Sequence, residues 1–320
     1  MNLEDRIRGT YYGWFFGTGA ILRRGLNFNY ERIKEHEEYS NIESFEEIPS
    51  TYEMYDQLTQ TQIIHDVLVE NSKITPELFK KRLLELNEKD DILNNEQYGP
   101  STKKAVRKLL EGKDPRETGK KGVTTGGTMR CMPLGVYFSD DREKLIENTY
   151  QSCIISHNTD VAIGSALSVT LTISNLLNGL NFKEALKNSL KTVEETYGDF
   201  GEPTAFAHVY ERIKDSIVKV EGKSFEEATE IIAKKIGYSW YAIEGIPAGF
   251  ALYQATDSPQ EAALMSFKAG YNETAPQIAC SFYGAQEGSS IFPQEIIEKM
   301  NRKNNIDIDG MVDEIVGKVL

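Results

Sequence analysis

The sequence predicts an all-α protein, and three observations support this expectation. Nearly every segment of the 320-residue chain repeats its apolar residues with the period of a helix. No convincing series of strands appears, and β-hairpin turn pairs are scarce. Glycines and prolines separate the helical segments where helices usually end and begin. One helical domain over residues 1–320 is the simplest organisation, with the stretch 27–51, rich in Glu, Asn and Tyr, as a surface excursion.

The N-terminal apolar run, "GTYYGWFFGTGAIL", predicts a buried first helix. It is broken by glycines, is followed by Arg23 and Arg24, and has no small-residue cleavage site, so it does not resemble a signal peptide. It is also too short to span a bilayer. We therefore expect no membrane association and a cytoplasmic location.

The helices that follow differ in how much of their surface is apolar. The segment 58–71 places Ile63, Ile64, Val67 and Leu68 on one face, and the next segment opens with Pro76 at a first-turn position. The segment 160–179 is apolar or small all round, which is typical of a helix at the centre of a bundle. Three later amphipathic helices are expected to end at glycines, namely Gly198, Gly222 and Gly237.

Composition narrows the possible partners. The net charge of −13 argues against a nucleic-acid-binding surface, whereas the 40% hydrophobic and 27% charged residues are ordinary for a globular protein. The three cysteines, Cys131, Cys153 and Cys280, lie in apolar surroundings without metal-ligand spacing. We interpret them as reduced core thiols. The sequence leaves the oligomeric state open.

Polar residues gather beside glycine in several loops. In "TTGGTMR", Gly126 and Gly127 could let backbone N–H groups approach an anion, or could simply form a turn that needs positive φ. His157 precedes the most apolar helix and is either a capping residue or a catalyst. Near the C-terminus, Thr274-x-x-Gln277 with Pro276 in the first turn predicts a capping box.

Six segments follow one another in order along the chain: "RIRGTYYGWFFGTGA", "YGPSTKKAVRKLLEG", "TTGGTMRCMPLGVYF", "SHNTDVAIGSALSVT", "EGIPAGFALY" and "KAGYNETAPQIACSFYGAQEG". Together they resemble the ADP-ribosylglycohydrolase family over most of the chain. The resemblance implies an all-α orthogonal bundle, removal of ADP-ribose from a side chain or related acceptor, and two magnesium ions in a central cleft.

The sequence departs from the family pattern at the metal ligands. The family normally has Thr-Asp-Asp-Thr where this chain has Tyr55-Asp56-Gln57-Leu58. It has Gly-Gly-Asp-Thr-Asp followed by Thr or Ser where this chain reads Gly270-Tyr271-Asn272-Glu273-Thr274-Ala275, and Gly-Asp-Ala where this chain has Gly17-Thr18-Gly19. Magnesium prefers carboxylate oxygens, so we predict no dinuclear magnesium site and no cofactor.

The resemblance also implies a retained ligand cradle for ADP-ribose or a nucleoside-like small molecule. Tyr55 and Tyr271 are bulky where the family has small residues, and would reshape the pocket or stack on a base. The full set of ligand-binding candidates is Thr125, Gly126, Gly127, Thr128, Met129, Arg130, Tyr55, Gln57, Tyr271, Asn272, Thr274 and Glu244. Arg130 could instead bridge helices, and Glu244 could cap one.

Two functions fit this pattern. The first is a glycohydrolase-type enzyme that cleaves an N-glycosidic or related bond without the two-metal mechanism. Its carboxylates would be Asp56, Glu273 and Asp160, with His157 as a proton donor. The second is a relative that has lost hydrolysis and serves as a ligand-binding or structural protein. The polarity retained in these loops favours the enzyme.

Overall fold

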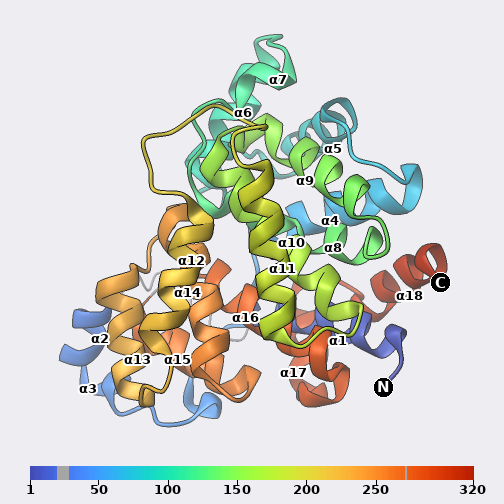
Figure 1. Cartoon of the computed structure of the whole chain (residues 1–320). Helices are drawn as coiled ribbons and strands as arrows, with labels where there is room; N and C mark the ends of the chain where they lie inside the picture. The colour runs from blue at the N-terminus through green and yellow to red at the C-terminus, as the bar shows by residue number, and fades with distance from the viewer. Residues whose placement is uncertain (20–28, 271) are drawn as a thin grey trace. The chain divides into compact units, whose positions relative to one another are not determined.

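The computed structural model describes residues 1–19, 29–270 and 272–320 (Figure 1). Within these ranges the regular structure is helical, and strand pairing is limited to two isolated bridges, Asn29 with Gly270 and Thr159 with Glu202. The all-α prediction is therefore confirmed. The chain forms two compact units, Met1–Met54 with Glu211–Val312, and Tyr55–Tyr210 with Asp313–Leu320.

The first unit combines the N-terminal part of the chain with most of its C-terminal third. Its elements are α1 (Leu3–Gly19), α2 (Tyr30–Glu35), α3 (Glu37–Ser40), η1 (Phe45–Glu47), most of α12 (Val209–Val220), α13 (Phe225–Ile231), η3 (Ile232–Ile236), α14 (Ala242–Ala255), α15 (Pro259–Ala269), α16 (Thr274–Glu287), η4 (Ser289–Ile291), α17 (Gln294–Asn304) and the start of α18 (Ile308–Val319).

The second unit contains the middle of the chain. Its elements are α4 (Asp56–Asn71), α5 (Pro76–Asp90), α6 (Pro100–Leu110), α7 (Pro115–Thr118), η2 (Thr125–Arg130), α8 (Met132–Tyr137), α9 (Arg142–His157), α10 (Asp160–Leu177), α11 (Phe182–Thr196), the first residues of α12 and the end of α18.

The first unit is organised around a close contact between α1 and α16. Glycines recur every four residues on α1, at Gly9, Gly13 and Gly17, and so lie on one face. A Cβ atom on Gly13 would stand 2.1 Å from the carbonyl oxygen of Cys280, and one on Gly17 would stand 2.2 Å from that of Pro276. Only glycine allows two helix backbones to approach this closely.

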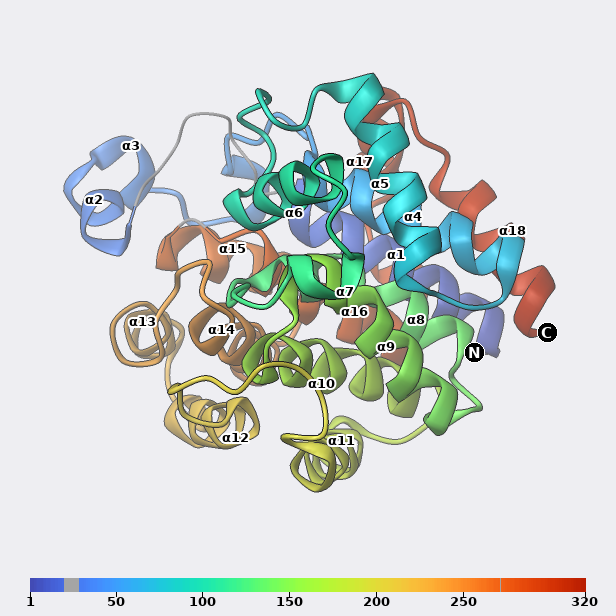
Figure 2. The same cartoon turned by 90° about the horizontal axis from the view of Figure 1, so that it is seen from above.

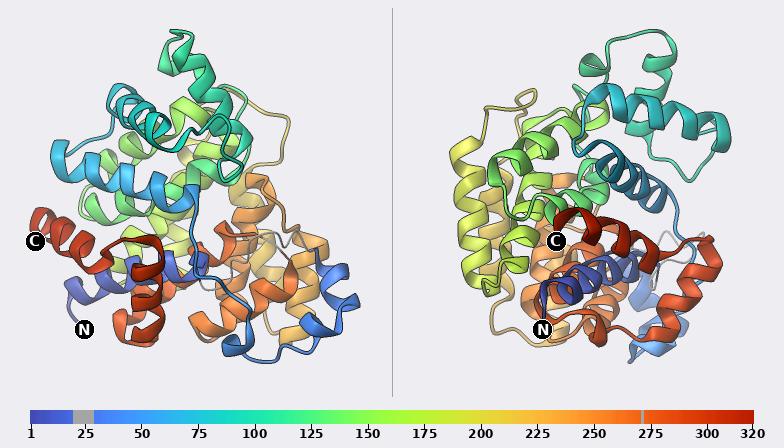
Figure 3. Two further views of the ribbon diagram at one scale, coloured as in Figure 1. Left: turned by 180° about the vertical axis from the view of Figure 1, so that it is seen from behind. Right: turned by 90° about the vertical axis from the view of Figure 1, so that its right-hand side faces the viewer.

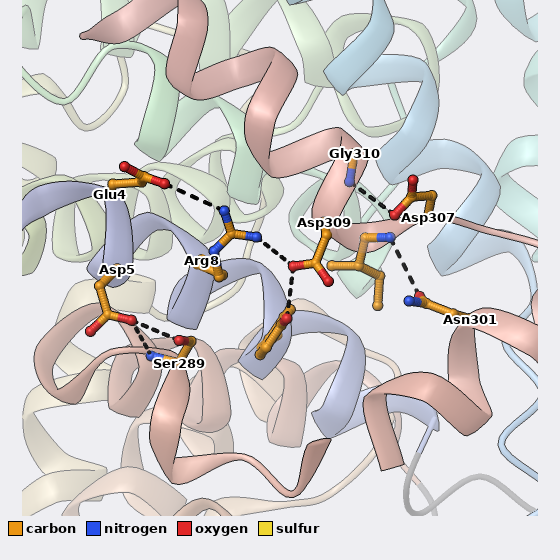
Figure 4. A network of polar contacts seen from close by, with 10 residues as sticks. Glu4, Asp5, Arg8, Ser289, Asn301, Asp307, Asp309 and Gly310 are labelled. Atoms are coloured by element: carbon orange, nitrogen blue, oxygen red, sulfur yellow. Dashed lines mark hydrogen bonds and ion pairs between the residues drawn. The ribbon is translucent and has the colours of Figure 1, made fainter. Parts of the chain in front are cut away.

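The other faces of α1 bind the C-terminal helices. α17 packs against α1 (Figure 3). In the N-terminal half of α1, Arg8 pairs with Asp309 of α18. The Tyr12 hydroxyl donates to the same carboxylate at 2.7 Å (Figure 4). Asp5 Oδ1 accepts from the backbone N–H and the hydroxyl of Ser289 (Figure 4). These contacts explain why a helix this apolar begins with charged residues.

The second unit is organised around α10, against which α8, α9 and α11 pack (Figure 2). α10 is long and apolar enough to cross a membrane by length and composition, but 94% of that window is buried inside the protein. A helix that is apolar on every side and covered by neighbours belongs to a protein core. The prediction of a central buried helix is confirmed.

Helix ends agree with the sequence. Pro76 begins α5, with Thr75 Oγ1 accepting from the Leu78 N–H. The three expected glycine stops all have positive φ, at 92° for Gly198, 67° for Gly222 and 96° for Gly237. The three cysteines are buried thiols, as predicted.

The described part of the stretch 27–51 carries α2, α3 and η1. It buries Tyr39 and Phe45, and Phe16 of α1 stacks on Phe45 with ring centroids 5.0 Å apart.

The glycine face of α1 leads to a stability prediction. Gly13→Ala should lower the free energy of unfolding by about 3 kcal/mol or more, because the new methyl group meets backbone that cannot rotate away. Gly317→Ala in α18 is the matched control, since a Cβ there meets nothing within 4 Å. It should be neutral or stabilising by about 0.5–1 kcal/mol. Urea unfolding of both variants measures the difference; equal stabilities would contradict the backbone contact.

Candidate functional site

Asp56, the first residue of α4, is a buried carboxylate with fixed orientation. Its Oδ2 accepts from the backbone N–H of Gly99 at 3.3 Å and from Gln60 Nε2 at 3.4 Å. Gly99 is the residue that precedes α6, so the carboxylate ties the start of α4 to the start of α6. A carboxylate in the first turn is also favoured by the helix dipole.

Arg130 is a fully buried cation connected to this carboxylate through Gln60. Its Nη1 donates to Gln60 Oε1 at 2.7 Å, and its guanidinium lies over the Phe79 ring at 4.7 Å. Nη2 donates to the carbonyl oxygen of Ser152 and the hydroxyl of Ser156, both in α9. Burial lowers the pKa of Arg130 to about 10, so it stays charged at neutral pH. This geometry matches the expected alternative of a helix-bridging arginine.

His157 continues the chain of hydrogen bonds. Its Nδ1 lies 2.7 Å from Ser156 Oγ, and its Nε2 lies 2.8 Å from Thr124 Oγ1. Because Ser156 Oγ accepts from Arg130, its proton is directed to Nδ1, and Nε2–H then donates to Thr124. Burial, together with the nearby Arg130 charge, holds the pKa of His157 well below its usual value. The imidazole ring is therefore neutral and buried, and each of its two nitrogens is hydrogen-bonded.

The glycines of "TTGG" make room for this histidine. A Cβ atom on Gly126 would stand 2.6 Å from Cε1 of His157, and one on Gly127 would stand 3.1 Å from Cys153 Sγ. Neither glycine has positive φ, so the expectation of a turn that needs positive φ is wrong. All residues of η2, Thr125 to Arg130, are buried. The carbonyl oxygen of Met129 accepts a hydrogen bond from Thr61 Oγ1.

Two polar atoms of η2 have no hydrogen-bond partner among the described residues. They are the Thr128 hydroxyl and Arg130 Nε. A buried donor left unpaired costs about 1–3 kcal/mol, so such atoms usually bond to ordered water or a ligand. They are the observation in the second unit that best agrees with the expected ligand cradle.

Asp160 holds a loop. Its Oδ1 accepts from Val161 N–H at 2.6 Å and from Thr204 Oγ1 at 2.7 Å, and its Oδ2 accepts from Thr204 N–H at 3.0 Å. The backbones of Asp160 and Glu202 are also hydrogen-bonded. The carboxylate thus anchors the connection between α11 and α12 to the start of α10.

In the first unit, the head of α16 is capped by Asn272. Its Oδ1 accepts from the N–H groups of Thr274 and Ala275 at 3.0 and 2.9 Å, and its Nδ2 donates to the carbonyl oxygen of Ser239 at 2.7 Å. The predicted capping box is wrong: Thr274 lies inside the helix, and both amide atoms of Gln277 lack a partner among the described residues. An Asx-type side chain before the helix outcompetes the threonine because it reaches two N–H groups.

Glu273 and Glu244 each accept a hydrogen bond from the segment 238–241. Glu273 Oε2 accepts from Trp240 Nε1 at 3.1 Å, and Glu244 accepts from the Ser239 hydroxyl. Glu244 also packs against Gly237, where a Cβ would stand 2.7 Å from its side chain.

The predicted site residues therefore form two groups, one in each unit. The second unit brings together Asp56, Arg130 and His157 through hydrogen bonds, with Tyr55 and the buried Gln57 beside Asp56 in sequence. The first unit brings together Asn272, Glu273, Thr274 and Glu244 around Ser239. Tyr271 lies outside the described residues.

Comparison with known proteins identifies the family. A family model described as ADP-ribosylglycohydrolase matches residues 1–319. The chain belongs to the ADP-ribosylglycohydrolase family. It is 25% identical over 319 residues to "Uncharacterized protein YegU" of Escherichia coli K12, covering 95% of this chain and 94% of that protein. It is 22% identical over 316 residues to an "Uncharacterized protein" of Archaeoglobus fulgidus, with the same coverage.

A solved structure shares the fold of this ADP-ribosylglycohydrolase family member. A chain of an "ADP-ribosylglycohydrolase-related protein complex" superimposes with a TM-score of 0.68 at 17% identity, covering 100% of this chain and 99% of that chain. This likeness shows the all-α fold of the family. The resemblance stated from the loops is thereby confirmed.

The magnesium pair implied by the family does not fit the residues present. Asn272 uses its amide oxygen to cap α16 and its nitrogen as a donor, and Asp160 is bonded at both oxygens. Thr18, where the family has a carboxylate, bonds the carbonyl of Trp14 at 3.4 Å. Among residues 1–19, 29–270 and 272–320, no three His, Cys, Asp or Glu side chains form a metal-binding group. Independence from magnesium stays a prediction.

Four residues outside the predicted set are connected to these groups in the structure. Gln60, Ser156 and Thr124 link the predicted residues of the second unit, and Trp240 bonds Glu273 in the first. Gln60 could have been found, since it lies one helical turn after Asp56. The others depend on tertiary contacts that no local pattern reveals.

Substitution of the two glycines tests the packing around His157. Gly126→Ala should lower the free energy of unfolding by about 1–3 kcal/mol, because the ring that blocks the new methyl group is held at both nitrogens. Gly127→Ala is the matched neighbour, and should cost less because the closest atom is a cysteine sulfur at 3.1 Å. Chemical unfolding measures both; a more costly Gly127→Ala would overturn the assignment.

The neutral His157 predicts a pH dependence of stability. In the unfolded chain a histidine takes up a proton near pH 6.5, whereas burial prevents this in the folded protein. Below pH 6.5 the unfolded chain therefore binds more protons, and the free energy of unfolding falls by up to about 1.4 kcal/mol per pH unit for each such histidine. His65, whose pKa burial also lowers, acts in the same direction.

Urea titrations between pH 7 and pH 5 measure this slope. His157→Gln should flatten it. An unchanged slope in His157→Gln would show that the folded protein protonates His157.

Proposed function

We propose that this protein hydrolyses an N-glycosidic or related bond of an ADP-ribosyl or nucleoside-like small molecule in the cytoplasm, without a magnesium pair. In this reaction water supplies a hydroxyl group to the anomeric carbon and a proton to the departing group. A carboxylate is needed to orient the water and accept its proton, or to stabilise positive charge at the anomeric carbon.

Asp56 is the residue that we assign to this role, and its geometry is the observation on which the proposal depends. The backbone N–H of Gly99 and Nε2 of Gln60 both donate to its Oδ2. They fix the plane of the carboxylate, as a group that orients a reactant requires. Asp160 is less suitable, because its carboxylate anchors a loop by accepting from the N–H of Val161 and from the N–H and hydroxyl of Thr204.

A ligand-binding role without hydrolysis is the second candidate. The observation that favours it is that two predicted catalytic residues use their hydrogen bonds to hold other parts of the protein. His157 is neutral and bonded at both ring nitrogens, and Asp160 anchors a loop. A cleft whose polar residues serve the fold can still bind a ligand when its chemistry has been lost.

The enzyme hypothesis predicts the effect of Asp56→Asn. Asparagine keeps an acceptor for Gly99 N–H but removes the negative charge, so turnover should fall about 100-fold or more at temperatures where the variant is folded. The melting temperature should fall as well, because the buried Arg130 cation loses a nearby anion. The assay follows an ADP-ribosylated peptide, ADP-ribose and nucleosides by mass spectrometry, in EDTA and in magnesium. Asp140→Asn, on an exposed aspartate, is the control.

The outcomes distinguish the two functions. Hydrolysis in EDTA that Asp56→Asn abolishes supports the enzyme. Saturable binding of one of these molecules with no turnover in either buffer supports the ligand-binding protein. Activity that disappears in EDTA and returns with magnesium contradicts the metal-independent mechanism.

A further inference from the structure

A cavity of about 560 Å³ lies in the first unit, between α15, the η1 region and the start of α13. α15 packs against both η1 and α13, so these elements form its walls. Sites for small molecules usually have volumes of about 300–1,000 Å³. None of the residues that line this cavity is among the predicted site residues, and Asp56 belongs to the other unit. The cavity is therefore a separate feature of the molecule.

The cavity has an apolar floor formed by Phe45 of η1, Phe225 of α13 and Leu264 of α15. Phe45 and Leu264 are buried, and Phe225 is half-buried. Phe45 is also held by the ring of Phe16, which stacks on it. An apolar floor on fixed side chains can bury hydrocarbon groups of a ligand.

The rim of the cavity is acidic. Glu43, Glu46 and Glu226 are exposed, and Glu261 is half-buried. Within residues 1–19, 29–270 and 272–320, the carboxylates of the three exposed glutamates take part in no hydrogen bond or ion pair. Glu261 differs, because its Oε2 accepts from the backbone N–H of Asp257 at 2.8 Å. The hydrogen-bonding of the fold thus uses one of the four carboxylates.

One cation lines the same cavity, Lys268 of α15. Its Nζ donates to the carbonyl oxygen of Ser40 at 3.3 Å, which connects α15 to the last residue of α3. Four carboxylates and one ammonium group give the lining a net charge of −3. An anionic ligand would be repelled, and a neutral apolar ligand would leave this charge uncompensated.

A linear organic polycation is complementary to both parts of the lining. Its ammonium groups would pair with the rim glutamates, and its methylene segments would lie on Phe45, Phe225 and Leu264. Ion pairs at exposed carboxylates contribute little each, so burial of the methylene groups has to supply part of the affinity. An inorganic cation has the charge but lacks the hydrocarbon that the floor would bury.

We propose that this cavity binds a linear aliphatic polyamine of the spermidine type. The inference goes beyond the proposed hydrolysis and does not depend on it. The floor selects for the aliphatic chain, the rim selects for positive charge, and Lys268 is a positioning residue that connects two walls of the cavity.

Calorimetry on the full-length protein tests the floor and the rim together by comparing two probes of equal charge. Spermidine and hexaamminecobalt(III) are both trivalent cations at neutral pH, but only spermidine carries methylene groups. One spermidine should bind per chain, about 10-fold or more tightly than hexaamminecobalt(III). Both affinities should fall as salt is added. Equal affinities of the two probes, or no saturable binding of spermidine, would overturn the proposal.

Glutamate variants test whether the charge acts at this cavity or over the whole acidic surface. Glu46→Gln and Glu226→Gln should each weaken spermidine binding about 2- to 5-fold, since each removes one exposed carboxylate from the rim. Glu88→Gln, at an exposed glutamate of α5, makes the same change in net charge and is the matched control. If Glu88→Gln weakens binding as much as the rim variants do, the attraction is general and the cavity is not the site.

Phe225→Ala tests the floor separately. It should narrow the preference for spermidine over hexaamminecobalt(III), because it removes apolar surface and leaves every charge in place. An unchanged preference in the folded variant would contradict the role of the floor. Thermal denaturation shows whether Phe225→Ala is folded, and the glutamate variants at exposed positions decide the proposal if it is not.

Discussion

The backbone contact between α1 and α16 requires hydrogen atoms in place of side chains at Gly9, Gly13 and Gly17. The site residues at the head of α16 depend on this contact, because it determines where α16 lies in the first unit. Gly17 meets the carbonyl of Pro276, in the first turn of α16, so the contact reaches the helix end where Asn272 and Glu273 stand. Two helices in backbone contact have no side chains between them that could repack. A displacement of α1 would therefore displace α16 as well. The position of α16 therefore sets the position of its capping loop.

In the loop before α16, the side-chain amide of Asn272 makes a hydrogen bond that a carboxylate could not make. Asn272 accepts from two backbone N–H groups, as an aspartate would, but its Nδ2 also donates to the carbonyl of Ser239. An ionised aspartate has no donor, and would face that carbonyl with a repulsive contact. The asparagine is thus a positive structural choice for this loop arrangement. Its Nδ2 bond fixes the segment that carries Trp240.

The sequence predicted what periodicity and local chemistry determine. The all-α class, the buried α10, the proline at the start of α5 and the three glycine stops all follow from local patterns. The capping box failed because Asn272 already accepts from the Thr274 N–H, which the Gln277 side chain would bind in such a box. The reason for Gly126 could not be seen, because the His157 ring that fills its space comes from another helix. In the site, residue types were predictable, but their partners were determined by tertiary contacts.

The carboxylates differ in how strongly the fold itself requires them. Asp56 lies on a buried chain that ends in the Arg130 cation, and a buried cation without a nearby anion is strongly destabilising. The fold therefore has a reason to keep Asp56 whether or not hydrolysis occurs. Glu273 differs, because it bonds an indole that is 47% exposed, and a contact open to water contributes little to folding. The bond between Glu273 and Trp240 therefore contributes less to folding than the buried chain from Asp56 to Arg130.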